Sequence, residues 1–319
     1  KGDYMSLDSF FNPSSIAVVG VSNDPSKLGA VVFNNVIDAG FEGKLYAINP
    51  KCAGQELYGK PCYASVADLP EAMDLVVVVV PAKFTMPVID DAIKNKTKNI
   101  SIITAGFGEV GNHELEDSIA EKCIQNGINL LGPNCLGHIS TFDKVNASFA
   151  DGFPAQGNVA FVSQSGAYCS ALMDWAREKG IGFSHFISIG NKALLAEDRL
   201  LDALKNDKNT TAFIFYLESL KNGKEFLRVL KEVSKTKPVV IMEPGKSQKA
   251  QAASLSHTGS LAPNYRVLEI ALKGSGAIQA YTTRELFGLL EVLQYAKHTE
   301  FDGSVAILTN AGGVGVLSS

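Results

Sequence analysis

Short runs of β-branched residues recur along this chain between longer stretches with helical spacing. The most constraining run is five consecutive valines, Val76–Val80. β-Branched residues lose side-chain freedom in a helix, and a strand with one wet face would alternate apolar with polar residues. The run therefore predicts a central parallel strand that is buried on both faces, and with it an α/β fold.

Similar runs predict the other strands. Those of a first domain are Ile16–Val21, Lys44–Asn49, Leu75–Pro81, Ile100–Ala105 and Ile128–Leu131. The stretch 141–158, rich in Asp, Asn, Gly and Pro, interrupts the pattern. Strands then resume at Val159–Ser163, Phe186–Gly190, Ala212–Leu217 and Pro238–Met242. We therefore expect one α/β domain over residues 5–145 and a second over 157–300. A further strand and glycine turn at 301–319 predict the start of a third domain that is cut short.

Composition excludes several classes of protein. With 319 residues, 46% hydrophobic and 19% charged, the chain can build two ordinary cores. A net charge of −4 offers no basic excess for nucleic acid or anionic lipid, and the longest apolar run is far shorter than a membrane span. The five cysteines form no CxxC pair. We therefore expect no metal site, no nucleic-acid partner and no membrane contact. The expected location is a reducing cytoplasm.

Ligands of doubly wound sheets bind beyond the carboxyl ends of the strands, so the residues there are candidates for function. After the first strand, Gly20 lets backbone approach a phosphate, Ser22 presents a hydroxyl and Lys27 adds a positive charge. Asn49 and Lys51 follow the second strand. A lysine there suits a ligand with an additional phosphate better than the bare ribose diol of NAD.

The later strand ends of the first domain complete this rim. Pro81 follows the third strand, Gly106–Glu109 the fourth and Gly132–Cys135, with Asn134, the fifth. Each of these short motifs also suits an ordinary turn. The glycine pattern of a nicotinamide dehydrogenase is absent, because Ser22 and Pro25 stand where its second and third glycines belong.

The second domain carries a candidate anion site and a candidate nucleophile. Ser163, Ser165 and Gly166 lie between a strand and a helix, where backbone N–H groups point at the helix N-terminus, although plain N-capping explains them equally well. His257 lies among hydroxyl and glycine residues, a setting that suits a phosphorylated imidazole or a helix cap. Glu218 follows a strand and could accept an N–H from His257, or form a surface ion pair.

Taken in order, these motifs closely resemble the CoA-binding part of the NDP-forming acyl-CoA synthetases, including the α subunit of ADP-forming acetate–CoA ligase. The succinyl-CoA synthetase α subunit is a more distant likeness. The resemblance extends from Ser6 to Ser319. It rests on Gly20-x-Ser22 with Pro25 and Lys27, Asn49-Pro50-Lys51, Gly106-Phe107-Gly108-Glu109, Gly132-Pro133-Asn134, Ser163-Gln164-Ser165-Gly166, Gly190-Asn191-Lys192-Ala193, Tyr216-Leu217-Glu218 and Ser256-His257-Thr258-Gly259.

The resemblance implies a Rossmann-like CoA-binding domain followed by a flavodoxin-like domain of the succinyl-CoA synthetase type. By the same resemblance, His257 would carry a phosphoryl group, Glu218 would be its partner, and Ser163, Ser165 and Gly166 would steady the phosphohistidine. The residues implied to contact CoA are Gly20, Ser22, Lys27, Asn49, Lys51, Pro81 and Asn134.

The implied activity is a reversible ligase reaction, in which acyl-CoA, ADP and phosphate give a small carboxylic acid, ATP and CoA. An ATP-grasp module, absent from this sequence, would hold Mg²⁺ and ADP or ATP, so the chain is expected to be one subunit or a piece of the working enzyme. Two other classes stay open. One is a CoA-binding regulatory or acyltransferase-associated module without ligase activity, and the other is a nicotinamide dehydrogenase.

Two positions depart from the family pattern. Glu243-Pro244-Gly245-Lys246-Ser247 stands where the family usually has a segment like Lys-Ala-Gly-Arg-Ser, so a carboxylate replaces a cation. Leu194 stands where an acidic residue usually follows Asn-Lys-Ala. Neither change touches the histidine motif.

Overall fold

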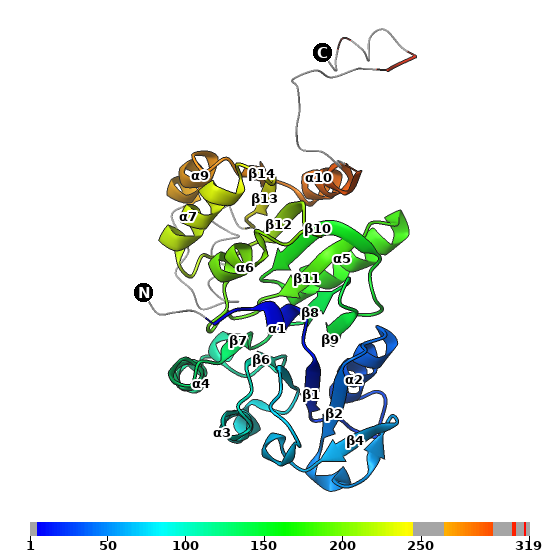
Figure 1. Cartoon of the computed structure of the whole chain (residues 1–319). Coiled ribbons are helices and arrows are strands. Elements are labelled where there is room, and N and C mark those ends of the chain that lie inside the picture. Colours follow the sequence, from blue (N-terminus) through cyan, green and yellow to red (C-terminus); the bar gives the residue numbers. More distant parts are fainter. Residues whose placement is uncertain (1–4, 245–264, 296–307, 311–315, 317–319) are drawn as a thin grey trace.

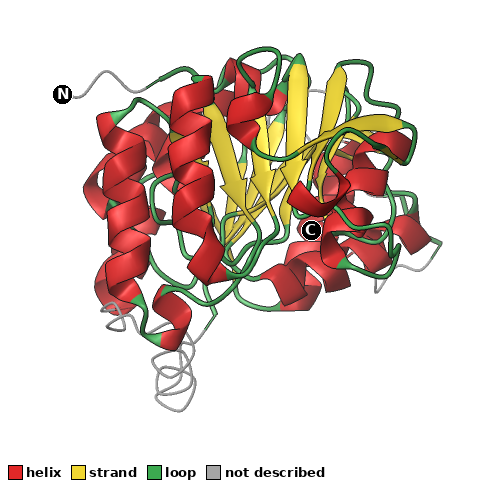
Figure 2. Ribbon diagram, turned by 90° about the horizontal axis from the view of Figure 1, so that it is seen from below, coloured by secondary structure: helices red, strands yellow, loops and turns green. Residues whose placement is uncertain are grey.

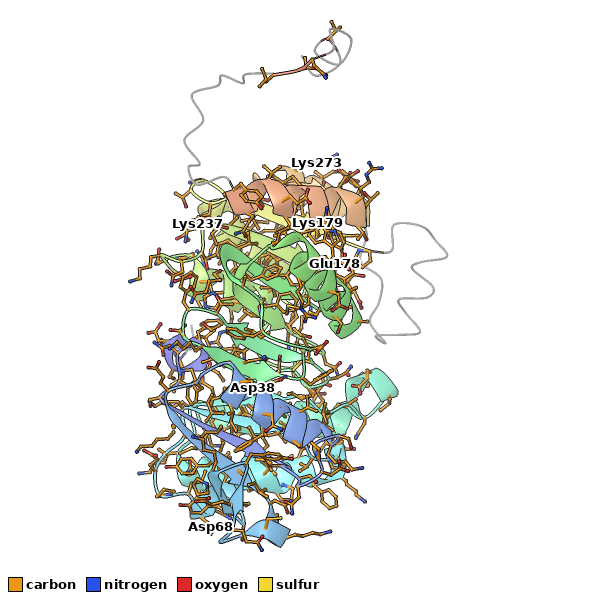
Figure 3. All side chains as sticks on the ribbon, turned by 90° about the vertical axis from the view of Figure 1, so that its right-hand side faces the viewer. Asp38, Asp68, Glu178, Lys179, Lys237 and Lys273 are labelled. Carbon is orange, nitrogen blue, oxygen red and sulfur yellow. The ribbon has the colours of Figure 1, made fainter. Side chains whose placement is uncertain are left out.

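The computed structural model describes residues 5–244, 265–295, 308–310 and 316, and these form two lobes (Figure 1). Each lobe is built on a seven-stranded sheet. Helices cover the strands on both sides (Figure 2). Charged side chains such as Lys179 and Lys273 lie at the outer surface, with more than half of each side chain exposed (Figure 3). The α/β class predicted from the sequence is confirmed.

The first sheet has the strand order β3-β4-β2-β1-β5-β6-β7. Its strands are β1 (Ser15–Val19), β2 (Lys44–Ile48), β3 (Glu56–Leu57), β4 (Lys60–Tyr63), β5 (Leu75–Val78), β6 (Asn99–Ile102) and β7 (Asn129–Leu131). The accompanying helices are α1 (Asp8–Phe11), α2 (Leu28–Asp38), α3 (Thr85–Asn95) and α4 (His113–Gln125). All four residues of β5 are buried, and β5 pairs in parallel with β1 and β6, so the valine run is the interior strand that its composition predicts.

The second sheet has the order β14-β13-β12-β10-β11-β8-β9. Its strands are β8 (Gly137–Ser140), β9 (Val145–Ser148), β10 (Gln156–Ser163), β11 (Phe183–Ser188), β12 (Ala212–Tyr216), β13 (Val239–Met242) and β14 (Ile278–Ala280). Its helices are α5 (Gly166–Lys179), α6 (Glu197–Leu204), α7 (Gly223–Val233), α9 (Tyr265–Lys273) and α10 (Thr283–Tyr295). The four strands predicted between residues 159 and 242 are all present.

The second sheet begins earlier in the chain than the predicted start of the second domain. Strand β8 lies within residues 5–145, which the sequence assigns to the first domain, and β9 begins at the last of these residues, yet β8 pairs antiparallel with β11 of the second sheet. The antiparallel hairpin covers an edge of that sheet which would otherwise expose unpaired backbone groups. The limits 5–145 and 157–300 stay predictions, and the third domain proposed at 301–319 lies almost wholly outside the described residues.

Backbone hydrogen bonds join the lobes along the free edge of β7. The N–H groups of Asn191, Ala193 and Leu195 each donate at 2.9 Å, to the carbonyls of Pro133, Gly132 and Leu130 respectively. A segment of the second domain therefore satisfies the edge strand of the first sheet. Side chains add to this junction, because Asn35 on α2 donates to the carbonyls of Ser148 and Ala150 at 2.9 Å.

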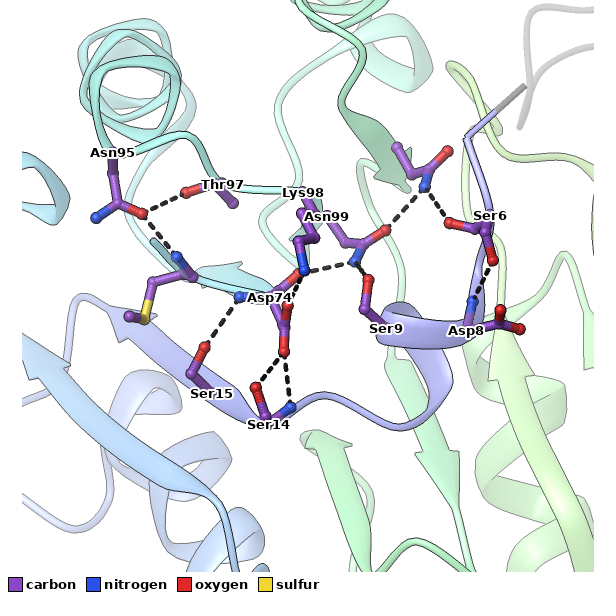
Figure 4. A network of polar contacts seen from close by, with 12 residues as sticks. Ser6, Asp8, Ser9, Ser14, Ser15, Asp74, Asn95, Thr97, Lys98 and Asn99 are labelled. Atoms are coloured by element: carbon purple, nitrogen blue, oxygen red, sulfur yellow. Dashed lines mark hydrogen bonds and ion pairs between the residues drawn. The ribbon is translucent and has the colours of Figure 1, made fainter. Parts of the chain in front are cut away.

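A polar network lies at the amino ends of the first sheet's strands, opposite their carboxyl ends (Figure 4). The carboxylate of Asp74 accepts from the backbone N–H of Ser14 at 2.8 Å and from Lys98 Nζ at 2.8 Å. Burial acts to raise the pKa of Asp74, but Lys98 and Ser14 outweigh it and hold the pKa below its ordinary value. Asn99 Nδ2 donates to the Asp74 carbonyl at 2.7 Å, so the network ties the starts of β5 and β6 together.

No described helix is both long and apolar enough to cross a membrane.

Two helical glycines should respond oppositely to replacement by alanine. A Cβ at Gly29 in α2 would lie 2.1 Å from the Gly20 carbonyl oxygen, whereas a Cβ at Gly288 in α10 would meet nothing within 4 Å. We expect Gly29→Ala to lower the free energy of unfolding by about 1–3 kcal/mol through backbone overpacking. Gly288→Ala should raise it by about 0.5–1 kcal/mol, because alanine favours a helix. Urea denaturation followed by circular dichroism measures both, and equal stability of the two variants contradicts the packing described here.

Candidate active site

A cleft of about 1000 Å³ lies where the carboxyl ends of the strands of both sheets meet. This volume is at the upper end of the range for small-molecule sites. The first domain contributes Pro81 and Asn134 to its lining, and the second contributes Ser165, Gly166 and Glu218. Candidate residues from both domains, which the sequence separates by as many as 137 positions, therefore share one cleft.

The turn after β1 is shaped for close backbone approach. Gly20 has φ +99°, and a Cβ there would lie 3.1 Å from the Val79 carbonyl oxygen. Ser22 Oγ accepts the N–H of Asp24 at 3.1 Å, so that hydroxyl is part of the turn itself. Lys27 is exposed at the N-cap of α2, beside Leu28 in the cleft wall.

Asn49 ties the ends of β1 and β2 together. Its Nδ2 donates to the Val21 carbonyl at 2.7 Å, and its Oδ1 accepts the backbone N–H of Lys51 at 3.0 Å. The Lys51 side chain is exposed. Ser22, Lys27, Asn49 and Lys51 thus form a rim at the ends of two neighbouring strands, called here the β1–β2 rim, and they lie outside the lining of the cleft.

The candidate anion loop is ordered by its own hydroxyls. Ser163 Oγ accepts the backbone N–H of Ser165 at 3.1 Å and donates to the Ser165 carbonyl at 2.9 Å. Ser165 Oγ caps α5 by accepting the N–H of Tyr168 at 3.3 Å. Ser165 is therefore the N-cap of α5, as one interpretation of the sequence predicts. Gly166 begins the helix, and a Cβ there would meet nothing within 4 Å, so the helix N-terminus opens on the cleft.

Glu218 follows β12 and reaches the cleft from the second sheet. Its backbone N–H donates to Gln164 Oε1 at 3.0 Å, and the N–H of Ser219 donates to the same oxygen at 3.2 Å. His257 and its flanking motif lie outside the described residues, so the predicted pairing of His257 with Glu218 stays a prediction.

Three side chains bridge the domains at the cleft through contacts that the sequence did not predict. Asn191 Nδ2 donates to Glu109 Oε2 at 2.6 Å and to Glu116 Oε2 at 2.8 Å. Burial acts to raise the pKa of Glu109, but hydrogen bonds from the Gly106 N–H and from Asn191 hold it below its ordinary value. The motifs holding Glu109 and Asn191 were visible after strands, but nothing in the sequence pairs residues so far apart.

A buried lysine lies behind this bridge. Lys192 is 3% exposed, and its Nζ donates to the Ser219 carbonyl at 2.6 Å and to Glu197 Oε2 at 3.2 Å. Burial lowers the pKa of Lys192, while the Glu197 carboxylate opposes that shift. Lys221 completes the cluster, because its backbone N–H donates to Glu197 Oε1 at 2.7 Å and its Nζ to the Lys192 carbonyl at 2.6 Å.

The two departures from the family pattern have different structural settings. Leu194 is half-buried and packs against the core of the first domain, so an apolar contact between the lobes replaces the usual charge. Glu243 is 8% exposed directly after β13, beside the segment that follows β12. Among the described residues, no three His, Cys, Asp or Glu side chains are grouped to hold a metal ion.

Comparison with known proteins identifies the family. Residues 14–141 match the CoA binding domain, and residues 156–293 match the succinyl-CoA ligase like flavodoxin domain. Over 319 residues the chain is 40% identical to acetate–CoA ligase [ADP-forming] I subunit alpha of Pyrococcus furiosus, with 99% of this chain and 69% of that subunit covered. The chain belongs to the NDP-forming acyl-CoA synthetases. The resemblance inferred from the motifs is confirmed, and so is the order of a Rossmann-like and a flavodoxin-like domain.

Other relatives of this family are longer than the chain. Acetate–CoA ligase [ADP-forming] I of Archaeoglobus fulgidus is 40% identical over 316 residues, which are 98% of this chain and 45% of that protein. The dinucleotide forming acetyl-coenzyme A synthetase 1 of Ca. Korarchaeum cryptofilum, solved in complex with phosphate and ADP, matches with a TM-score of 0.93 and 40% identity, covering 98% of this chain and 67% of that one. The chain thus spans about half the length of the Archaeoglobus fulgidus protein.

Replacing Asn191 by aspartate should make stability depend on pH. In the native chain the pKa of Glu109 is lowered. The stability that its carboxylate contributes is therefore fully present above its unfolded pKa and is lost as pH falls through its folded pKa. In Asn191→Asp a third carboxylate faces Glu109 and Glu116, so we expect the variant to lose stability at about pH 7.5 and to regain part of it at about pH 5. Asn191→Ala, which adds no charge, is the control. Thermal unfolding at both pH values measures the difference, and a larger deficit at the lower pH contradicts the bridge.

Proposed function

We propose that this chain is the CoA-binding and phosphohistidine-carrying part of an ADP-forming acid–CoA ligase. The observation that carries the proposal is the shared cleft, which presents Asn134 and Pro81 of the CoA-binding domain to Ser165, Gly166 and Glu218 of the flavodoxin-like domain. A thioester carbonyl and a phosphoryl group can be brought together only where both domains contribute to one site. The CoA-binding module without ligase activity would not need the second half of this cleft.

CoA binding is assigned to the first domain. Lys27 and Lys51 on the β1–β2 rim offer point charges to the pyrophosphate and ribose phosphate, and Gly20 and Ser22 allow backbone to approach them. Leu28, next to Lys27, belongs to the cleft wall. The pantetheine arm would run from the rim past Leu28, so that the thiol enters the cleft near Asn134.

The chemistry is a relay in three steps. A phosphate oxygen attacks the thioester carbonyl carbon of acyl-CoA, the C–S bond breaks, and CoA leaves as the thiolate with an acyl phosphate formed. A ring nitrogen of His257 attacks the phosphorus of the acyl phosphate, and the carboxylate leaves. An oxygen of the ADP β-phosphate then attacks the phosphorus on His257, and the P–N bond breaks to give ATP and the free imidazole.

The second domain supplies charge compensation for this relay. Glu218 would accept the N–H of the other ring nitrogen of His257 and so fix which nitrogen attacks. The N-terminus of α5, with Ser163, Ser165 and Gly166, would donate backbone N–H groups to the phosphoryl oxygens.

The nucleotide is assigned to a partner. Mg²⁺ and ADP or ATP would bind on an ATP-grasp domain or subunit, where the ion would neutralise phosphate charge. This assignment is supported by the relatives, of which one is an alpha subunit and another is more than twice as long as this chain. The acid is a small carboxylic acid, since relatives are named for acetate and for 4-hydroxybutyrate. All five cysteines are free thiols, which suits the proposed cytoplasmic location.

His257→Asn should abolish phosphoryl transfer and leave CoA binding intact. Asparagine keeps polarity but lacks the nucleophilic nitrogen, so the acid-labile phosphoryl group expected on the wild-type enzyme during turnover should be absent from the variant. Intact-mass measurement of the complete enzyme after mixing with acetyl-CoA, phosphate and Mg²⁺ measures the label, and calorimetry with CoA is the control. Undiminished turnover of the variant excludes a phosphohistidine at this position.

Lys27→Ala and Lys51→Ala should each weaken CoA binding roughly tenfold, because each removes a charge-assisted contact to phosphate. Lys208→Ala, an exposed lysine away from the rim, is the matched control. Calorimetry with CoA, dephospho-CoA and NAD decides the assignment: dephospho-CoA should bind less well than CoA, and NAD least. Equal binding of NAD and CoA, with both variants unaffected, restores the dehydrogenase interpretation.

A further inference from the structure

We propose that Gln164 and Lys192 are positioning residues that together fix the backbone of Glu218 and Ser219 at the cleft. The inference rests on the proposed function, in which the Glu218 carboxylate orients His257. Both side chains belong to the cleft lining, and the role proposed for them is exerted on the backbone of Glu218 and Ser219. Each acts through the segment that follows β12 and brings Glu218 into the cleft lining.

Gln164 holds this segment from the side of β10. Its Oε1 accepts two consecutive backbone N–H groups, from Glu218 at 3.0 Å and from Ser219 at 3.2 Å. Its own backbone N–H donates to the Tyr216 carbonyl at 3.0 Å, in continuation of the pairing of β10 with β12. Gln164 therefore fastens the backbone of Glu218 and Ser219 to the anion loop.

Lys192 holds the same segment through the carbonyl and hydroxyl of Ser219. Its Nζ donates to the Ser219 carbonyl at 2.6 Å and lies 3.4 Å from Ser219 Oγ. Gln164 Nε2 donates to Ser219 Oγ at 3.3 Å. The N–H, the carbonyl and the hydroxyl of Ser219 are thus all engaged, and the peptide that carries Glu218 cannot turn without breaking several hydrogen bonds.

Lys192 also sets the local charge. The ionisable groups that act on it are Glu197 and Asp198 at the start of α6 and Glu218 after β12, while Lys221 donates to its carbonyl. Glu197 is fully buried and pairs with the ammonium group. A buried ion pair of this kind is seldom retained for stability alone, because burying the charges costs as much as their attraction returns. Here the cation would favour the ionised form of Glu218, which the reaction requires.

The test uses four single variants and one double variant of the complete enzyme, with acetyl-CoA, phosphate and ADP as substrates. Gln164→Met and Lys192→Met keep side-chain length but remove the acceptor and the charge. The matched controls make similar contacts away from the cleft. Gln156, at the other end of β10, donates to the Thr141 carbonyl at 3.3 Å, and Lys237 Nζ donates to the Asp207 carbonyl at 2.8 Å. Gln156→Met and Lys237→Met remove these.

We expect kcat to fall roughly tenfold to a hundredfold in both cleft variants, with KM for acetyl-CoA changed by less than about twofold, because orientation is lost while binding is kept. Both controls should keep the wild-type kcat. The pH profile separates the two roles. Lys192→Met removes a cation beside Glu218, which raises the pKa of that carboxyl, so the acidic limb of the kcat profile should move to higher pH. Gln164→Met should lower kcat without moving that limb.

The double variant Lys192→Met/Glu197→Gln removes both buried charges and should still lower kcat, with a smaller shift of the acidic limb because losing the Glu197 carboxylate opposes the effect of losing the Lys192 cation. A folding failure of the single variant therefore leaves the inference testable. Wild-type kcat in both cleft variants overturns the inference while leaving the proposed function intact. A drop in kcat that the two controls share also overturns the inference. If wild-type enzyme forms no phosphohistidine and makes no ATP, the proposed function fails, and this inference fails with it.

Discussion

The structure depends on a short backbone ladder between its two lobes. N–H groups of residues 191–195 donate to carbonyls of residues 130–133 at the edge of β7. Gly190 makes this approach possible: it has φ +54°, and a Cβ there would lie 2.3 Å from the Pro133 carbonyl oxygen, so another residue would push the segments apart. Because both segments leave the carboxyl ends of their strands, the ladder brings the two ends that carry candidate residues to one cleft.

Polar residues at the amino ends and at the carboxyl ends of the first sheet's strands have different roles. Around Asp74, at the amino ends of the strands, serine, asparagine and lysine side chains satisfy one another and tie α1 to the sheet (Figure 4). At the carboxyl ends, Asn191 joins Glu109 and Glu116 across the domain boundary, and Lys192 links this bridge to the segment of Glu218. A change in how the lobes meet would therefore reach Glu218 through Asn191, Lys192 and Ser219.

Much of the fold was predictable from the sequence, since buried parallel strands read as continuous β-branched runs. The strands that escaped prediction, β3, β4, β8, β9 and β14, have two to four residues each and lie at or near sheet edges, where no such run is needed. The rule of strand ends found Asn134, Ser165 and Glu218. It missed the contact of Asn191 with Glu109, which joins residues 82 apart and depends on how two sheets meet.

In the proposed reaction, one cleft between the domains receives both the CoA thiol and the phosphate. The most direct measurement is a crystal structure of the complete enzyme with CoA and phosphate bound. We expect the CoA phosphates at Lys27 and Lys51, the thiol in the cleft beside Asn134, and inorganic phosphate at the N-terminus of α5 near Ser165. A CoA molecule whose thiol points away from Glu218, or a phosphate held only by the first domain, contradicts this arrangement.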